Sequence, residues 1–369
     1  MALDALWLRA SDGIRAVFGG VFEWDGGDPL DPSAMAVTAL GMGLPILLGV
    51  MIGRPTIGLA ASVGGMWVGN APRGSTLGEH LRILRDIVAA AIVAAVVAAL
   101  IAQHGLWSDT WLVLTAGATA LVGGFSRPMA VASQRFIVFA TIGMNVAAHA
   151  HNRPAVAILI SEGAIWTALC ALVIGMAARR LKIGTAEPLE TGSTAPLKAK
   201  MKRWRGTLKT FQGWNYAIRL AACLAAATAI REAFPTHHFG WIAVAVALLT
   251  QRQAEGLTIK VTQRALGVAA GVLATELIAA RPLSAWALVV IVAGLGALSP
   301  WLRKRSYVAD TAATTPLIML LTSGGLTIGQ DLLLDRLVAT LIAAALVISA
   351  FQAAARLKPP PSPESPRSG

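Results

Sequence analysis

Residues 58–82 read GLAASVGGMWVGNAPRGSTLGEHLR, and residues 240–264 read GWIAVAVALLTQRQAEGLTIKVTQR. Each stretch holds a short apolar run, a polar loop and the start of a longer apolar run. Three residues recur 182 positions later: Gly58, Gly74 and Arg82 in the first stretch, and Gly240, Gly256 and Arg264 in the second. Two copies of one set of apolar segments predict an internally repeated membrane protein, in which a transport path forms where the two bundles meet.

The composition favours a membrane protein over a soluble one. Of 369 residues, 56% are hydrophobic and 14% are charged, whereas about 25% charged residues are usual in soluble domains. The 36 glycines suit helices that approach each other closely in lipid. The net charge of +12 comes from short basic clusters between apolar segments. Membrane lipids are therefore expected partners, and nucleic acid is not.

Apolar segments bounded by charge, proline or glycine predict an all-α integral membrane protein with about twelve transmembrane helices in two six-helix repeats. The first module, residues 34–180, has segments near 34–53, 56–71, 86–103, 110–124, 131–149 and 155–178. The second module, residues 215–355, has segments near 215–233, 238–251, 265–281, 284–299, 307–323 and 331–354. Several are shorter than the ~20 residues that a perpendicular span needs, so these must be tilted, partial or extended by their flanks.

Three regions lie outside the modules. Residues 1–33 have apolar residues at helical spacing and are expected to form an amphipathic segment on the membrane or a solvent-exposed arm. Residues 181–214 form a basic linker, which the positive-inside rule places in the cytoplasm. An even number of spans then places both termini there as well. Residues 356–369 are rich in proline and serine and are expected to be disordered.

The sequence contains no motif for enzymatic chemistry. It has no paired-cysteine motif, no Walker-type phosphate loop, no His-Glu-x-x-His helix and no Gly-x-Ser-x-Gly elbow. Neither the two cysteines nor the closely spaced histidines have the arrangement of metal ligands. We therefore expect no enzymatic activity, no direct use of ATP, no cofactor and no metal.

The second module carries two short signatures. RALGVAAG at 264–271 and DRLVAT at 335–340 resemble the Arg-x-x-Gly-Thr-x-x-Gly and Arg-x-x-Asp-Thr-x-x-Gly signatures of the fusaric acid resistance, or FUSC-type, family. The resemblance covers roughly residues 215–354, and the first half resembles a more divergent copy. This sequence departs from the pattern at Val268, at Ala339, where the family has an acidic residue, and at Ala343. Larger relatives, which resemble aromatic acid exporters, carry a substantial cytoplasmic domain where this chain has only a short linker.

Three acidic residues at predicted membrane depth are candidates for binding a coupling proton, namely Glu162, Glu276 and Asp310. An ionisable side chain is costly in lipid and is a functional candidate by default. The alternative for Glu276 and Asp310 is a structural ion pair with an arginine or a position at the end of a span. For Arg336, a local ion pair with the aspartates nearby in sequence is expected.

Four residues are candidates for binding an anion. Arg82 and Arg264 occupy equivalent places, and a guanidinium binds a carboxylate at two points. Their alternative role is as topology markers and phospholipid anchors. Gly58 and Gly240 belong to short segments, and broken helices could direct amide groups toward an anion. The alternative for both glycines is close helix packing.

The resemblance and the repeat together favour secondary efflux of small organic acids, aromatic acids in particular, across the inner membrane, with coupling to protons. The expected partners are the organic anion, membrane lipids and further copies of the chain in a homo-oligomer. Two alternatives remain open. One is a passive organic-anion channel, in which arginine and glycine positions line an open path. The other is a non-transport envelope protein that holds lipid or a partner between its halves.

Overall fold

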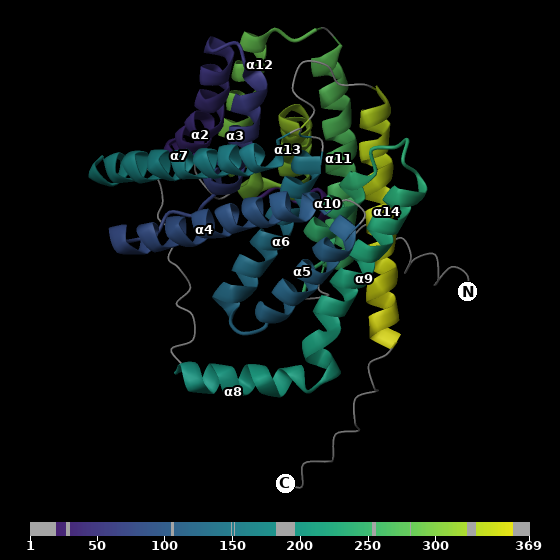
Figure 1. The fold of residues 1–369 in the computed structure, drawn as a ribbon. Helices are drawn as coiled ribbons and strands as arrows, with labels where there is room; N and C mark the ends of the chain where they lie inside the picture. The colour runs from purple at the N-terminus through teal and green to yellow at the C-terminus, as the bar shows by residue number, and fades with distance from the viewer. Residues whose placement is uncertain are drawn as a thin grey trace, which may run out of the picture.

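The computed structural model describes residues 20–356, apart from 27–29, 105–106, 149, 151, 182–195, 253–255, 281 and 323–329. The described residues form helices α2 to α14 and no strand (Figure 1), which confirms the all-helical prediction. Most of the expected N-terminal segment, and nearly all of the expected C-terminal tail, lie outside the described residues.

Helices occur at all twelve predicted apolar segments. The first half contains α2 (Pro32–Met51), α3 (Pro55–Gly69), α4 (Leu77–Ala102), α5 (Ser108–Val122), α6 (Arg127–Ala148) and α7 (Arg153–Arg180). The second half contains α9 (Phe211–Ala233), α10 (Gly240–Leu249), α11 (Leu257–Ala279), α12 (Ala285–Arg305), α13 (Tyr307–Thr322) and α14 (Gln330–Arg356). Helices α4 and α11 begin earlier than predicted, because the prediction followed apolar residues and the first turns of these helices are polar. The N-cap Thr76 of α4 accepts a hydrogen bond from the Glu79 amide at 3.1 Å.

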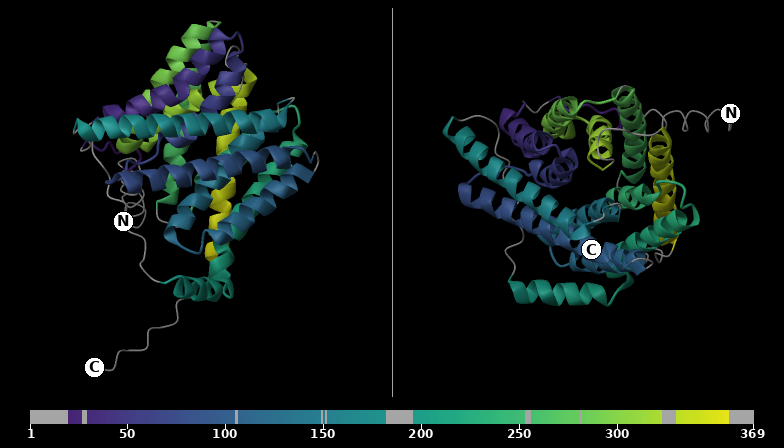
Figure 2. Two further views of the ribbon diagram at one scale, coloured as in Figure 1. Left: turned by 60° about the vertical axis from the view of Figure 1, so that its left-hand side comes forward. Right: turned by 45° about the horizontal axis from the view of Figure 1, so that its top comes forward.

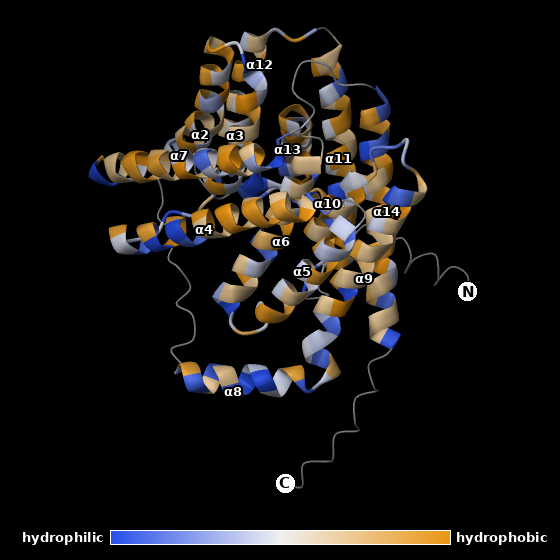
Figure 3. Cartoon of the chain, in the orientation of Figure 1, coloured by the Kyte–Doolittle hydropathy of each residue, from blue (hydrophilic) through white to orange (hydrophobic). Residues whose placement is uncertain are grey.

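The linker holds a helix that the sequence did not predict, α8 (Leu197–Leu208). Its sequence, LKAKMKRWRGTL, is rich in basic residues and none of its side chains is fully buried. Figure 3 shows α8 as largely hydrophilic, whereas apolar residues cover much of the long helices. Leu100, Ile158, Val173, Leu273 and Val290 are each more than half exposed, as expected where lipid covers a protein surface.

In the part of the chain that the structure describes, seven helices are long and apolar enough to cross a membrane, namely α2, α4, α6, α7, α11, α12 and α14. Helix α9 has the length but is too polar, and α3, α5, α10 and α13 are shorter than 18 residues. The 10 residues of α10 extend about 15 Å, about half of the hydrocarbon thickness. The structure therefore supports a multi-pass membrane protein but does not confirm twelve spans.

Helices at equivalent places in the two halves have equivalent neighbours. In the first half α3 packs on α2 and α7, and α4 packs on α6 and α7. In the second half α10 packs on α9 and α14, and α11 packs on α13 and α14. Contacts across the interface between the two halves, referred to below as the seam, are also reciprocal. Helix α2 packs on α12, and their counterparts α9 and α5 pack on each other. Figure 2 shows the purple helices α2 and α3 lying among the light green helices of the second half.

The segment that precedes each half crosses to the other half. Trp24, before α2, packs edge-on against Trp301 of α12, with ring centroids 6.0 Å apart. Trp204, in α8 before α9, packs edge-on against Phe125, after α5, also at 6.0 Å. The Asp25 amide donates to the Arg305 carbonyl at 2.9 Å, and the Trp204 indole donates to the Leu121 carbonyl at 3.1 Å. These two segments, 20–26 and 197–208, are referred to below as the arms.

The two short central helices are buried in different ways. A Cβ at Gly64 of α3 would overlap the carbonyl oxygen of Ile160 in α7, and a Cβ at Gly163 of α7 would overlap that of Ala61 in α3. The backbones of α3 and α7 therefore touch. Helix α10 instead buries apolar side chains completely, including Ile242 and Val244. Its burial on every side explains why its sequence has no polar face.

Candidate functional site

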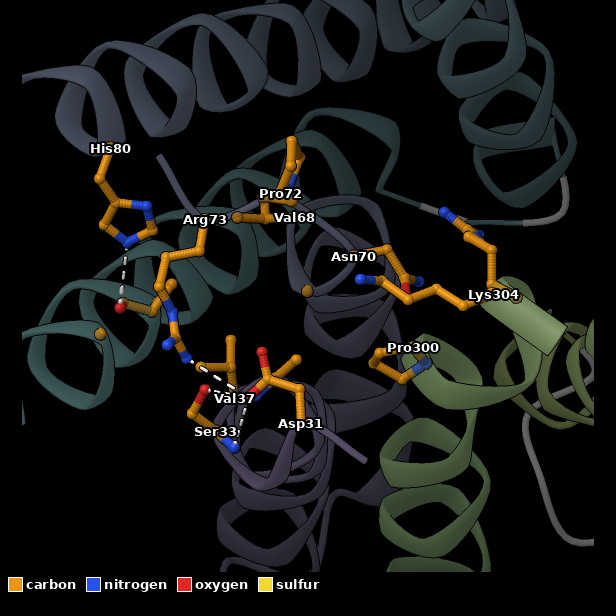
Figure 4. Close-up of a pocket in the computed structure, with 16 residues that line it drawn as sticks. Asp31, Ser33, Val37, Val68, Asn70, Pro72, Arg73, His80, Pro300 and Lys304 are labelled. Atoms are coloured by element: carbon orange, nitrogen blue, oxygen red, sulfur yellow. Dashed lines mark hydrogen bonds and ion pairs between the residues drawn. The ribbon is translucent and has the colours of Figure 1, made fainter. Parts of the chain in front are cut away.

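A cavity of about 350 Å³ lies where the start of α2, the ends of α3 and α12, and parts of α4 and α7 meet (Figure 4). Small-molecule sites have volumes of about 300–1,000 Å³. Because α12 belongs to the second half and the other four helices to the first, this cavity lies at the seam. We refer to it as the seam cavity.

The lining of the seam cavity is rich in positive charge. Arg73, Arg303 and Lys304 line it together with one carboxylate, Asp31. Asp31 caps α2 by accepting hydrogen bonds from the Ser33 and Ala34 amides at 3.1 and 3.3 Å, and its Oδ1 lies 3.5 Å from Nη2 of Arg73. Figure 4 shows Arg73 reaching toward Asp31, with Lys304 on the opposite side. The excess of cationic side chains suits an anionic ligand.

His80 contributes a further polar side chain to the same lining. Its side chain is 3% exposed, and its Nε2 lies 3.2 Å from the carbonyl oxygen of Ala171. That carbonyl can only accept, so Nε2 carries the proton in this contact. The Nδ1 atom is buried and has no hydrogen-bond partner among the described residues.

A chain of polar contacts leads from the seam cavity to Asp310. Asn70, after α3, donates through Nδ2 to Ser299 Oγ of α12 at 3.4 Å, and Ser299 Oγ lies 3.3 Å from Asp310 Oδ1 of α13. The other carboxylate oxygen lies 3.5 Å from Nε of Arg303. Asp310 is 7% exposed. The buried carboxylate thus touches a cation that itself lines the cavity. An ion pair with an arginine was one of the two sequence-based interpretations of Asp310.

The two candidate arginines lie in different environments. Arg264 is 6% exposed, and its Nη1 donates to the Tyr307 hydroxyl at 3.4 Å. Arg82 is exposed, because α4 turns His80, Leu84 and the residues that follow at helical spacing toward the core. The structure therefore does not bring the two arginines into one site, and their roles in binding remain predictions.

The other two candidate carboxylates lie at the surface. Glu162 is exposed on α7 beside the exposed apolar residues Ile158 and Ile165. Glu276 is exposed near the end of α11 and accepts a hydrogen bond from Gln330 Nε2 of α14 at 3.0 Å. Of the three proton-coupling candidates, Asp310 alone is buried.

Both candidate glycines lie at close helix contacts. A Cβ at Gly58 would overlap the carbonyl oxygen of Pro45 in α2, and a Cβ at Gly240 would lie 2.8 Å from Oδ1 of Asn145 in α6. Gly58 lies inside α3, whereas Gly240 begins α10. Close packing, the alternative interpretation of these glycines, accounts for both positions.

The expected ion pair between Arg336 and a neighbouring aspartate is wrong for Asp335. Asp335 Oδ1 lies 2.8 Å from Nδ1 of His237, and its Oδ2 accepts from the His238 amide at 2.7 Å. Arg336 is 1% exposed and lies 4.2 Å over the ring of Trp241. Consecutive residues of a helix point about 100° apart, so the two side chains leave α14 on different faces.

The sequence did not predict that Arg336 is buried without a neighbouring carboxylate, although Ala339 was an indication of it. Its Nε and Nη1 atoms have no hydrogen-bond partner among the described residues. Residues three apart share a helix face, and Ala339, which is completely buried, stands where the family pattern has an acid. An acid at that position would lie beside the guanidinium. Its replacement by alanine leaves a buried cation without that counter-ion.

No group of three or more histidine, cysteine, aspartate or glutamate side chains that could hold a metal ion occurs among the described residues. Cys170 and Cys223 are both buried and unpaired. A role in packing is the ordinary one for such thiols.

Comparison with known proteins gives one family. Residues 223–350 match the family model described as fusaric acid resistance protein-like, which confirms the resemblance found in the sequence. The match begins within α9 and ends within α14, so it includes Arg264, Asp310 and Arg336. Neither the curated proteins nor the solved structures give a match.

Proposed function

From the match of residues 223–350 to the family model described as fusaric acid resistance protein-like, we propose that this protein is a secondary efflux transporter. It carries small organic acids, aromatic acids in particular, across the inner membrane and is coupled to protons. The basic linker and both termini lie in the cytoplasm. The organic anion enters at the seam cavity, whose lining carries three cations and one carboxylate.

We also propose that the two halves are repeats of one ancestral unit. The equivalent neighbours of α3 and α10, and of α4 and α11, together with the reciprocal contacts across the seam, support two repeats. Six spans in each half would relate them by a pseudo-two-fold axis along the membrane normal. In such transporters the substrate site lies at the repeat interface, and the seam cavity lies there.

Asp310 is the proposed proton carrier because of its position. It is buried, it belongs to the second half, and it contacts Arg303, which lines the cavity. Protonation of Asp310 removes the negative charge beside Arg303. The charge of the cavity lining therefore changes with the protonation of Asp310, which couples the binding of a proton to the binding of an anion.

Vesicles reconstituted with the purified protein test the proposal. An imposed pH gradient is expected to drive movement of one or more members of a panel of benzoate, phthalate and aliphatic carboxylates, after leakage through protein-free vesicles is subtracted. Asp310→Asn is expected to abolish the gradient-driven component. Glu276→Gln and Glu162→Gln remove exposed carboxylates and are expected to leave transport within about twofold.

Two outcomes would contradict the proposed function. One is the absence of gradient-dependent movement across the whole panel. The other is an electrical current far above carrier turnover that Asp310→Asn leaves unchanged, which would identify a passive channel.

A further inference from the structure

A second cavity, of about 340 Å³, lies across the seam where α5, α8, α9 and α14 meet. It is built from the end of α5, the start of α9, the residue Arg252 after α10 and the end of α14. By order in each half, these are the counterparts of α12, α2, the residues after α3, and α7 around the seam cavity; the linker cavity lacks a described residue from α11, the counterpart of α4. The second cavity has one extra wall, since Trp204, Thr207 and Leu208 of α8 line it. We refer to it as the linker cavity.

Among the described residues, the lining of the linker cavity includes two arginines and no acidic residue. Arg219 donates through Nη2 to the Gln251 carbonyl at 3.2 Å, and Arg252 donates through Nη2 to the Ala120 carbonyl at 2.7 Å. Carbonyl groups are neutral, so these contacts orient the guanidinium groups without balancing their charge. The Nε of Arg219 is buried and has no hydrogen-bond partner among the described residues.

Burial also affects Arg252 directly. It lowers the pKa of the Arg252 guanidinium from its ordinary value, and the nearby Tyr216 opposes this shift. This is the direction expected of a cation removed from water without a carboxylate beside it.

Aromatic rings hold both guanidinium groups in place. Arg252 lies 4.4 Å from the centre of the Tyr216 ring, and Arg219 lies 5.1 Å from that of Phe351. The Tyr216 hydroxyl donates to Gln134 Oε1 at 2.5 Å, which fixes the ring. A guanidinium stacked on a ring keeps the N–H groups at its edge for an anion.

We propose that the linker cavity is a second anion site, which binds one carboxylate or phosphate group between Arg219 and Arg252 with an apolar or aromatic body against Trp204 and Phe351. The ligand is a free organic acid or the headgroup of an anionic lipid, which offer the same oxygen acceptors. Because α8 forms one wall, a bound ligand joins the linker to α9 and α14. Occupancy therefore orders residues 197–208.

Hydrogen exchange of the α8 backbone amides tests this site and requires no transport. The full-length protein is placed in nanodiscs of neutral phosphatidylcholine and titrated with benzoate. In a separate arm the nanodiscs contain phosphatidylglycerol and no benzoate. One or both conditions are expected to slow exchange over residues 197–208 by about tenfold. Slowing by benzoate indicates a free acid, and slowing by phosphatidylglycerol alone indicates a lipid headgroup.

Two double variants, each of which removes two positive charges, distinguish binding in the cavity from attraction to the exposed surface of α8. Arg219→Gln with Arg252→Gln is expected to abolish the slowing. Arg203→Gln with Arg205→Gln removes two exposed charges from α8 outside the cavity lining and is expected to retain it. Asn215→Asp is a third variant, which keeps both arginines and places a carboxylate of the same size in the lining. It is expected to raise the ligand concentration needed for half-maximal slowing by about tenfold.

The proposal is overturned if neither benzoate nor phosphatidylglycerol slows exchange in the unmodified protein, a measurement that needs no variant to fold. It is equally overturned if the two double variants lose the slowing to the same extent, because general attraction to the basic linker would then explain the effect. Neither result bears on gradient-driven transport through the seam cavity, so failure of this site is distinguishable from failure of the proposed function.

Discussion

The two halves of this protein share their helix neighbours but differ in where they place charge. In the first half, Arg82 and Glu162 lie exposed on α4 and α7. In the second half, Arg264, Asp310 and Arg336 lie buried on α11, α13 and α14. One packing scheme therefore accommodates a half whose candidate charged residues lie at the surface and a half that buries three charged side chains. The half with the buried charges is the half that matches the family.

The helix faces explain the difference. Helix α11 buries Leu257, Val261, Arg264 and Val268, which follow the spacing of one helical face. Helix α4 buries residues at the same spacing, but Arg82 lies off that face. Equal sequence offsets thus place Arg82 and Arg264 in equivalent helices without giving them equivalent surroundings. Four predictions test or refine this comparison.

The largest effect is expected where the first half depends on backbone contact. Gly64→Val would force α3 away from Ile160 of α7 and is expected to cost at least about 3 kcal/mol, because two helix backbones must separate. Gly294→Val is the matched control, since a Cβ at Gly294 meets no atom within 4 Å. Monodisperse yield and melting temperature in detergent measure both. A folded Gly64→Val variant with an unchanged melting temperature would refute the close contact.

The next effect concerns the buried charge of the second half. Arg336→Met is expected to stabilise the protein by about 1–3 kcal/mol, because an uncompensated buried charge costs several kcal/mol, whereas a desolvated cation–π contact returns ~2 kcal/mol. Arg82→Met changes an exposed position and is expected to stay within about 0.5 kcal/mol. The melting temperatures of both variants, compared with that of the unmodified protein, test these two expectations. A lower melting temperature for Arg336→Met would mean that the guanidinium has a stabilising partner.

A smaller effect is expected on transport. Arg264→Gln is expected to reduce vesicle transport about tenfold, or ~1.4 kcal/mol, because it removes a buried cation on the inner face of α11. Arg82→Gln is expected to change the rate less than twofold. Equal losses in the two variants would contradict the expectation that burial of the arginine determines its role in transport.

The smallest effect is expected for the ion pair at the seam cavity. Asp31→Asn keeps an N-cap for α2 but loses the pair with Arg73, and is expected to cost ~0.5 kcal/mol because both side chains are partly exposed. Asp31→Ala also removes the cap and is expected to cost about 1 kcal/mol more. Melting curves of the two variants separate the contributions. A larger loss in Asp31→Asn than in Asp31→Ala would contradict this assignment.

The sequence was sufficient to predict most helices, because the length of each apolar segment and the charge, proline or glycine at its ends set the bounds. It was insufficient for α8, whose basic residues give no apolar run, and for the first polar turns of α4 and α11. The seam cavity could not be predicted, since it joins Asp31, Asn70 and Arg303 from helices far apart in sequence. Which of Glu162, Glu276 and Asp310 is buried depends on helix rotation, and that is fixed by packing rather than by local pattern.

The reciprocal arms have a mechanical consequence. Trp24 and Trp204 each fasten one half to the other, and each does so on a helix that also contributes to one of the two cavities. A rocking motion of one half against the other must pivot about these two fastenings or break them. During the proposed transport the two halves could separate only as far as these two contacts allow, so the arms would limit where the molecule opens.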